Sequence, residues 1–539
     1  MRKIKMEEDL MRKRGTYLVV LGLLLVLFLT ACGSKPTEEQ STGTDNNATS
    51  ETREEGNQEA TGKNEIVFVV ASEAPSMDPI RSNDSAATDA QSQLMDGLTR
   101  FDPETSELVP YLATDFEQIE PTVWEFNLRE GVYFTDGAPF DADVVALNLN
   151  RLLNIEEASP ALFIVEMITE VEVVDTYTVR IHTAYPFAPL ASHFAHRATF
   201  MVSPNAIEAA GVGEDVEPIG TGAFVLSERE HGNYMLMERN EEHWNDLAIP
   251  DAVRFIVVPD PVTRFAMIQT GEAHYAVGQA SDYATASGID SIDARLLPST
   301  SLAYVGFNTT KGALADPLVR RAISHAIDRN AILEGIYEGV GSIATGPLSP
   351  LVDLAPTIEG LEYDVDLARE LLEESGHTNI ELEFWYNEGN STRGLIGVYV
   401  QAALAEIGIT VNVSSVEWGA YLEATAAGEH DMYILGWTTV TGDADYGLYS
   451  LFHSSQVGDP GNRFFFENAE VDALLESGRE SADRTARAEV YQELAELLVN
   501  EAPMVELVFQ DFVLLSNGVD NVYTNFNNVP FFYNATLRD

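Results

Sequence analysis

The stretch Ile380–Val416, which reads IELEFWYNEGNSTRGLIGVYVQAALAEIGITVNVSSV, decides the fold class of this chain. Residues 380–385 form a strand pattern in which Ile380, Leu382 and Phe384 alternate with other residues. Residues 392–407 follow a helical pattern that stops at Gly408, and residues 409–416 form a second strand pattern. A strand, a helix and a strand joined by short loops predict a βαβ unit with a right-handed crossover. The chain is therefore expected to be an α/β protein.

The same mixture of elements continues on both sides of this unit. Asp316-Pro317 and Asp364 are typical of helix starts, because aspartate caps free backbone N–H groups and proline fits the first helical turn. Residues 431–437, 65–71 and 253–258 form further strand patterns. The whole body is therefore expected to alternate strands and helices, with no internal repeat.

The N-terminus has the pattern of a bacterial lipoprotein signal. Basic residues 12–14 precede the apolar segment Leu18–Leu29, whose 12 residues are too short to span a bilayer about 30 Å thick. The tetrapeptide Leu29-Thr30-Ala31-Cys32 then has the form of a lipobox. We expect residues 1–31 to be a signal peptide that begins at Met1 or Met11. Lipidation of Cys32 would anchor the chain at the outer face of the cytoplasmic membrane, whereas a simple signal peptide followed by a free cysteine is the alternative.

Residues 32–63 are expected to be a disordered tether. From residue 33 onward this segment contains no aromatic residue and no Leu, Ile or Val, so it cannot bury enough apolar surface to offset its ordering entropy. The folded body is expected to begin at Asn64 and exceeds the length of one typical core. Because Cys32 is the only cysteine of the chain, no disulfide bond is expected in the body.

The charge of the chain excludes some partners. With 31 basic and 86 acidic residues, the formal net charge is −55, which argues against nucleic acid. Lys311 is the only lysine after Lys63, so arginines supply nearly all other cations of the body. Acidic residues occur in every segment, which favours a halophilic source over a single acidic functional face.

No catalytic pattern stands out in the sequence. There is no phosphate-binding loop of the Walker type and no GxSxG elbow. His193 and His196 are three residues apart but lack a glutamate between them and a third ligand nearby. We therefore expect neither an enzyme nor a metal site, and no cofactor.

Four segments, in order, resemble one family of binding proteins. They read WEFNLREGVYFTDGAPFDADVV at 124–145, PIGTGAF at 218–224, FNTT at 307–310 and RRAISHAID at 320–328. This order is similar to that of the peptide/nickel/opine class (family 5) of ABC-transporter solute-binding proteins. Within the class, the chain looks most like dipeptide-, oligopeptide- and glutathione-binding lipoproteins.

The resemblance implies a type II periplasmic-binding-protein fold with two hinged α/β lobes. The first lobe would comprise residues 64–100, 220–308 and 508–539, the inserted domain residues 101–219, and the second lobe residues 309–507. Such a protein would act as a monomer, enclose a short peptide by hinge closure and deliver it to a permease driven by an ATPase.

The segment GWTTVTGDADY, residues 436–446, is the first candidate for ligand contact. It follows an apolar strand, and ligands of open α/β sheets bind beyond the carboxyl ends of strands. A carboxylate there could meet a ligand ammonium. The resemblance makes Asp445 the first choice and Asp443 the second, while a turn with both carboxylates in water is the alternative.

Two arginines and three aromatic residues complete the predicted site. Arg393 begins the helix of residues 392–407, where helix geometry favours anions, and an arginine can bind a carboxylate with two hydrogen bonds. Arg463 resembles an arginine of the oligopeptide- and glutathione-binding relatives. The aromatic candidates for the cleft are Trp418, Trp437 and Tyr446. A surface position for either arginine, or a core position for each aromatic residue, remains open.

Two other functions remain open from the sequence. A protein of this class could bind a nickel chelate, haem, an opine or an oligosaccharide instead of a peptide. It could also present a peptide to a receptor without transport.

Overall fold

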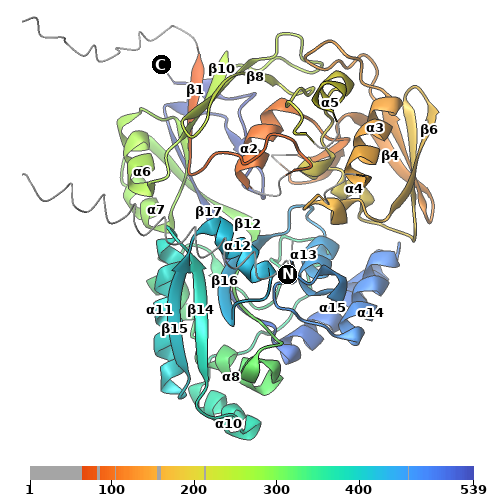
Figure 1. The fold of residues 1–539 in the computed structure, drawn as a ribbon. Coiled ribbons are helices and arrows are strands. Elements are labelled where there is room, and N and C mark those ends of the chain that lie inside the picture. The colour runs from red at the N-terminus through yellow and green to blue at the C-terminus, as the bar shows by residue number, and fades with distance from the viewer. Residues whose placement is uncertain are drawn as a thin grey trace, which may run out of the picture. The chain divides into compact units, whose positions relative to one another are not determined.

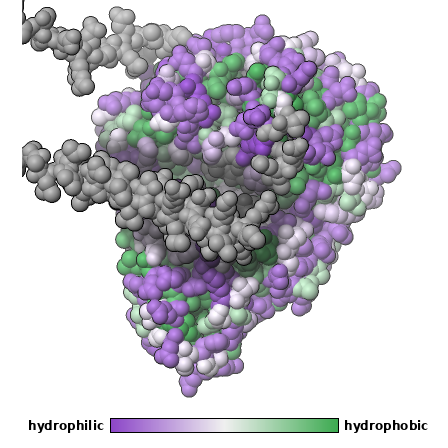
Figure 2. All heavy atoms as spheres, viewed as in Figure 1, coloured by the Kyte–Doolittle hydropathy of each residue, from purple (hydrophilic) through white to green (hydrophobic). Residues whose placement is uncertain are grey.

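The computed structural model describes residues 64–81, 85–102, 105–154, 159–211, 214–458 and 461–538. The predicted signal peptide and the whole predicted tether, which begins at Cys32, lie outside the described residues. Residues Gly62–Asp539 form one compact unit (Figure 1). On the face in Figure 2, hydrophilic residues cover much of this unit. Among the described residues, no helix is both long enough and apolar enough to cross a bilayer.

One mixed sheet of 11 strands runs through the unit, in the order β15-β14-β16-β12-β17-β11-β1-β10-β9-β8, with β13 paired to β17. Its strands are β1 (Glu65–Val70), β8 (Phe224–Glu230), β9 (Tyr234–Arg239), β10 (Ala252–Val257), β11 (Tyr275–Gly278), β12 (Ile292–Phe307), β13 (Ser342–Ile343), β14 (Glu381–Asn387), β15 (Thr410–Val416), β16 (Met432–Thr438) and β17 (Met504–Asn517). The predicted strands at 65–71, 253–258 and 431–437 are confirmed to within one residue.

Two long antiparallel strands, β12 and β17, connect the halves of this sheet. The N-terminal half of β12 pairs with β17 next to β11, while its C-terminal half lies between β17 and β16. The register shifts between Pro298 and Leu302, where the pairing passes from one half to the other. A bulge bends and twists a strand, so we expect β12 to bend where the sheet passes from one half to the other.

Helices of the first half are α2 (Ser85–Leu94), α6 (Pro261–Thr270) and α7 (Ala280–Ala286). Asp260 caps α6 by accepting a hydrogen bond from the Thr263 N–H at 2.8 Å, and Gly271 ends it with a left-handed backbone (φ 76°). The C-terminal segment adds the short strands β18 (Val519–Asp520), β19 (Tyr523–Thr524), β20 (Pro530–Phe531) and β21 (Thr536–Leu537).

The segment predicted as the inserted domain contains a separate four-stranded antiparallel sheet, β4-β5-β7-β6. Residues of the quoted WEFNL motif form β5, whose neighbour β7 pairs with β6 as a hairpin. In Figure 1, α3 and this sheet lie on the opposite side of the unit from α6 and α7. The elements are β2 (Thr99–Phe101), β3 (Leu108–Pro110), β4 (Ala113–Glu120), β5 (Val123–Leu128), α3 (Ala142–Leu153), η1 (Leu162–Ile164), β6 (Ile168–Asp175), β7 (Thr178–Thr183), α4 (Leu190–His193), η2 (Arg197–Thr199) and α5 (Pro204–Ala210).

The predicted βαβ unit is confirmed in the second half. Strands β14 and β15 pair in parallel, and α11 packs against both (Figure 1). The helical elements of this half are η3 (Gly312–Ala315), α8 (Pro317–Ala326), α9 (Arg329–Gly335), α10 (Val365–Ser375), α11 (Ser391–Glu406), α12 (Trp418–Ala426), α13 (Ala444–Phe452), η4 (Ser454–Gln456), α14 (Ala469–Glu480) and α15 (Arg484–Glu501).

Helix α13 differs most from the sequence-based expectation. The segment after Trp437 was expected to be a ligand-binding loop, but Asp443 caps a helix whose nine residues are all buried. Its carboxylate accepts a hydrogen bond from the Asp445 N–H at 2.9 Å. Both predicted carboxylates therefore belong to the start of a core helix.

Candidate ligand-binding cavity

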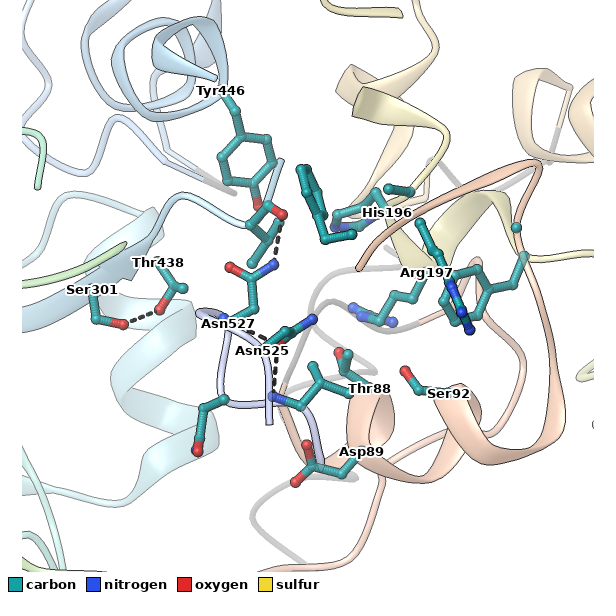
Figure 3. A pocket seen from close by; sticks show the side chains of 18 of the residues that line it. Thr88, Asp89, Ser92, His196, Arg197, Ser301, Thr438, Tyr446, Asn525 and Asn527 are labelled. Atoms are coloured by element: carbon teal, nitrogen blue, oxygen red, sulfur yellow. Dashed lines mark hydrogen bonds between the residues drawn. The ribbon is translucent and has the colours of Figure 1, made fainter. Parts of the chain in front are cut away.

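A cavity of about 740 Å³ lies between the two halves. In Figure 3, Thr88, Asp89 and Ser92 of α2 line one side, while Ser301 of β12 and Thr438 of β16 stand on the opposite side. The volume falls within the range of roughly 300–1,000 Å³ that is usual for small-molecule sites. It suits a ligand of the size of a short peptide.

Five of the seven predicted ligand-binding residues line this cavity: Arg393, Arg463, Trp418, Trp437 and Tyr446. They all belong to the second half of the sheet and its helices. Most of them lie in or directly after the βαβ unit, or in strand β16. Their contact with a ligand remains a prediction.

Arg393 lies in the first turn of α11, directly after the strand–helix loop. Asn390 caps this helix by accepting a hydrogen bond from the Arg393 N–H at 3.0 Å. The guanidinium donates to the Asn387 side-chain oxygen at 2.7 Å, which holds it near the end of β14. No carboxylate lies within ion-pair distance of this guanidinium in the described part of the chain. A ligand carboxylate could therefore approach it.

Arg463 is more deeply held, with a side chain that is 3% exposed. It donates from Nη1 to the Leu422 carbonyl at 2.6 Å and to the Thr425 hydroxyl at 2.9 Å. These bonds fix the guanidinium behind α12.

Two of the three aromatic candidates pack against each other in the cavity lining. The rings of Trp437 and Tyr446 are 5.5 Å apart, and Tyr446 also packs at 5.4 Å on Phe163, which lies in the segment predicted as the inserted domain. The Trp437 Nε1 atom is buried and has no hydrogen-bond acceptor among the described residues. Trp418 is 45% exposed and stacks on Tyr421 at 5.9 Å. Trp437 and Tyr446 thus form an aromatic wall with apolar faces, and the Trp437 Nε1 donor has no acceptor among the described residues.

Asp445 and Asp443 do not line the cavity, which corrects their expected position. The Asp445 carboxylate accepts hydrogen bonds from Arg479 at 3.0 and 3.2 Å, and the Asp443 carboxylate accepts from Arg487 at 2.6 and 3.0 Å. All four side chains are nearly inaccessible to solvent. Their negative charges are therefore already neutralised within the core, where an unpaired carboxylate would be very costly.

The charges around Asp445 also affect nearby titratable groups. Burial raises the pKa of Asp445, but the Arg479 guanidinium outweighs this effect and holds it below its usual value. Burial lowers the pKa of His193 to about 4, although Asp445 opposes this shift. Burial, followed by Arg197 and His193, lowers the pKa of His196 well below 6.5. Both imidazoles are therefore neutral at neutral pH.

The wall opposite α12 contains residues that sequence reasoning missed. Arg81, Asp89, Asp96 and Arg100 come from residues 64–100, which are predicted to belong to the first lobe, and Arg197 comes from the segment predicted as the inserted domain. Their sequence context gave no signal, because they are scattered over loops, a helix and a short strand. They approach the cavity only through the tertiary fold.

The C-terminal segment contributes two further lining residues that the sequence did not indicate, Asn525 and Asn527. Asn527 donates to the Val440 carbonyl at 2.7 Å and lies 3.4 Å from the Thr300 hydroxyl (Figure 3). It therefore joins the end of the chain to the loop that precedes α13.

The cavity reverses the charge balance of the chain. Its described lining includes five arginines but only two carboxylates, Asp89 and Asp96. Asp96 already accepts hydrogen bonds from the Thr221 hydroxyl at 2.7 Å and from Trp244 Nε1 at 3.3 Å. Asp89 of α2 is the other carboxylate that lines the cavity. Within the described residues, no group of three His, Cys, Asp or Glu side chains is arranged to hold a metal ion.

Comparisons with known proteins find that the chain is similar to solute-binding proteins over most of its length. Residues 107–459 match the family model described as bacterial extracellular solute-binding proteins, family 5 Middle. The glutathione-binding protein GsiB of Salmonella paratyphi A is 30% identical over 463 residues, which cover 83% of this chain and 90% of that protein. GsiB of Escherichia coli K12 is 29% identical over 460 residues, with the same coverage.

Solved structures of binding proteins are also similar to this chain over most of its length. The ABC transporter-associated periplasmic binding protein DppA of Helicobacter pylori, in complex with the peptide STSA, is 26% identical with a TM-score of 0.81. The match covers 88% of this chain and 98% of DppA. A dipeptide-binding protein of Pseudoalteromonas sp. SM9913, in complex with Met-Leu, shares the fold with a TM-score of 0.81 at 22% identity, over 88% of this chain and all of that one.

Proposed function

We propose that this chain, which belongs to the bacterial extracellular solute-binding proteins of family 5, captures short peptides in its cavity and delivers them to a permease. The coarser function follows from the family. The chain is an extracytoplasmic solute-binding protein of an ABC importer and not an enzyme. The predicted type II periplasmic-binding-protein fold is confirmed by the likeness to DppA.

The observation that carries the peptide proposal is the composition of the cavity wall. A peptide is a zwitterion, and the cavity offers Asp89 on one lobe and Arg393 on the other. We assign the ligand ammonium to Asp89, in place of Asp445 and Asp443, because Asp89 lines the cavity and the other two aspartates do not. We assign a ligand carboxylate to Arg393. The relatives named after glutathione and the DppA complex with STSA support this ligand class.

Binding is proposed to proceed by closure of the two predicted lobes about β12 and β17. Closure removes water from the cavity, so an ion pair that is worth about 1 kcal/mol in bulk water becomes several times stronger. The aromatic wall formed by Trp437 and Tyr446 would pack against peptide side chains without selecting one sequence.

Native mass spectrometry of protein purified from cells tests the ligand class, because a closed cavity can retain its ligand. The bound mass is expected to match peptides of a few residues, with affinity confirmed by calorimetry after the ligand is removed in denaturant. Retention of a nickel chelate, haem, an opine or an oligosaccharide, together with no binding of any short peptide, would overturn the proposal. Binding without permease and ATPase genes nearby would favour a peptide-presenting sensor.

Membrane anchoring through Cys32 is a separate part of the proposal and rests on the lipobox pattern alone. The mature protein is expected to begin at Cys32, to carry acyl chains and to partition into detergent. Cys32→Ser should release it into the soluble fraction. Unmodified Cys32 in the purified protein, measured by mass spectrometry, would contradict lipidation.

We also propose that the acidic composition adapts the chain to high external salt. At a net charge of −55, repulsion between surface carboxylates is long-ranged at low ionic strength and is screened to about 3 Å at 1 M salt. The melting temperature is therefore expected to rise as sodium chloride is added. A melting temperature that stays constant or falls would count against this interpretation.

A further inference from the structure

The ratio of basic to acidic residues in the cavity lining is the opposite of that in the whole chain. Acidic residues outnumber basic residues by 86 to 31 in the chain, yet arginines outnumber aspartates by five to two in the described cavity lining. A surface that carries cations only by chance would show the opposite ratio. Some of these cations are already satisfied within the protein, since Arg81 pairs with Asp215 and Arg463 donates to the Leu422 carbonyl. Because an unpaired buried charge is costly, the need for an anionic partner has to be judged for each arginine separately.

Arg393 and Arg100 are the two cavity arginines on which this need is clearest. Arg393 donates one hydrogen bond to a neutral amide, that of Asn387, and has no carboxylate partner in the described chain. Arg100 lies over the Tyr111 ring at 3.8 Å, and its Nε atom is buried without an acceptor among the described residues. Both guanidiniums thus retain donors for a ligand.

The two arginines approach from different parts of the fold. Arg393 begins α11 in the second half, whereas Arg100 lies in β2, at the end of the first lobe segment. One carboxylate of a ligand would pair with a single wall, so the second wall would remain without its anion. A ligand with two separate carboxylates could pair with both.

We propose that the natural ligand is a short peptide with a net negative charge, whose two carboxylates are bound separately by Arg393 and Arg100. This inference rests on the proposed function and narrows it to a charge class. An acidic dipeptide or tripeptide has two carboxylates and one ammonium, which match the two arginines and Asp89. Neutral and cationic peptides of the same length leave one guanidinium without an anion.

Calorimetry with matched tripeptides tests the inference on the ligand-free protein. Ala-Glu-Ala and Ala-Gln-Ala have nearly the same shape and differ by one charge. Ala-Glu-Ala is expected to bind at least about tenfold tighter, because hydrogen bonds to a charged group are about twice as strong as neutral ones. Ala-Lys-Ala is expected to bind more weakly than either.

Two variants assign the carboxylates. Of Arg393→Gln and Arg100→Gln, one should abolish the preference for Ala-Glu-Ala, and the other should weaken both peptides equally, because it binds the shared C-terminal carboxylate. Arg369→Gln is the matched control: Arg369 is a half-exposed arginine on α10 that does not line the cavity, so its loss should change neither affinity. Arg393→Lys and Arg100→Lys keep the charge and should retain part of the preference if a glutamine variant folds poorly.

The outcomes separate this inference from the proposed function. Equal or tighter binding of Ala-Gln-Ala would overturn the charge preference while leaving peptide capture intact. A preference for Ala-Glu-Ala that survives in both glutamine variants would overturn the assignment to these arginines. Failure of all three peptides, and of acidic dipeptides, would overturn the proposed function as well.

Discussion

The arginines behind α13 and the arginines of the cavity wall have opposite surroundings. Arg479 and Arg487 each donate two hydrogen bonds to an aspartate of the α13 N-terminus. Arg393 and Arg100 have no carboxylate within ion-pair distance in the described chain. The first pair of arginines thus completes the core, whereas the second pair is available to a ligand. Acidic residues can serve function indirectly, by fixing the helix that carries a wall residue such as Tyr446.

Asp445→Asn is expected to give the largest effect. It should lower the free energy of unfolding by about 3 to 5 kcal/mol, because it leaves the buried Arg479 guanidinium with only Glu166 as an acidic partner. Urea unfolding followed by circular dichroism measures this loss.

The matched control for this variant is Asp353→Asn. Asp353 pairs with Arg484 at the surface, where the side chains are 51% and 71% exposed, so its loss should cost less than about 1 kcal/mol. Equal stability of the two variants would contradict the structural role of Asp445. A stable Asp445→Asn protein that no longer binds peptide would restore Asp445 as a ligand contact.

The local elements of the fold could be predicted from sequence, because their signals lie within a few residues. The βαβ unit was predicted from its strand and helix periods, and Gly271 and Gly376 end their helices with the left-handed backbone that glycine favours. Arg393 was predicted at the cavity for the same reason, since a strand–helix loop positions it.

The charge partners could not be predicted, because they are distant in sequence. Arg479 is 34 residues from Asp445, and Arg487 is 44 residues from Asp443. One local signal did exist: Asp443 directly precedes the segment 444–452, which is rich in aromatic and aliphatic residues, and an aspartate in that position is typical of a helix cap. Asn527 reaches the cavity from the C-terminal segment, 87 residues beyond its partner Val440.

The buried His193, which lies near Asp445, should make the free energy of unfolding depend on pH. His193 is buried, with a pKa lowered to about 4 from 6.5. Between these values the unfolded chain binds a proton that the folded chain does not, so stability falls as the pH decreases through this window. From pH 7 to pH 5 this histidine should cost about 2 kcal/mol, at about 1.4 kcal/mol per unit of pKa difference.

Unfolding free energies of the wild type and of His193→Gln, measured at pH 7, 6 and 5, test this expectation. The variant should lose less stability than the wild type over that interval, even if it is less stable at pH 7. Subtraction of the two curves removes the contribution of the surface carboxylates, which both proteins share. Parallel curves would show that His193 is protonated to the same extent in the folded and unfolded chains.

The smallest expected effect concerns the contact between α14 and the inserted domain. Arg479 donates to Glu166 and to the Tyr185 hydroxyl, each at 3.3 Å, so its pair with Asp445 also joins the predicted second lobe to the predicted inserted domain. Because Glu166 is about one-third exposed, its hydrogen bond is worth about 0.5–1.5 kcal/mol. If this contact forms only when the lobes close, Glu166→Gln should weaken peptide binding by that amount, about two- to tenfold, mainly through faster dissociation. Glu496→Gln, within α15, removes the charge from a hydrogen-bond acceptor whose donor, Gln492, lies in the same helix, and it should leave dissociation unchanged. Equal dissociation rates for the two variants would mean that the contact persists in the open protein, and that the pairs behind α13 stabilise the fold without contributing to closure.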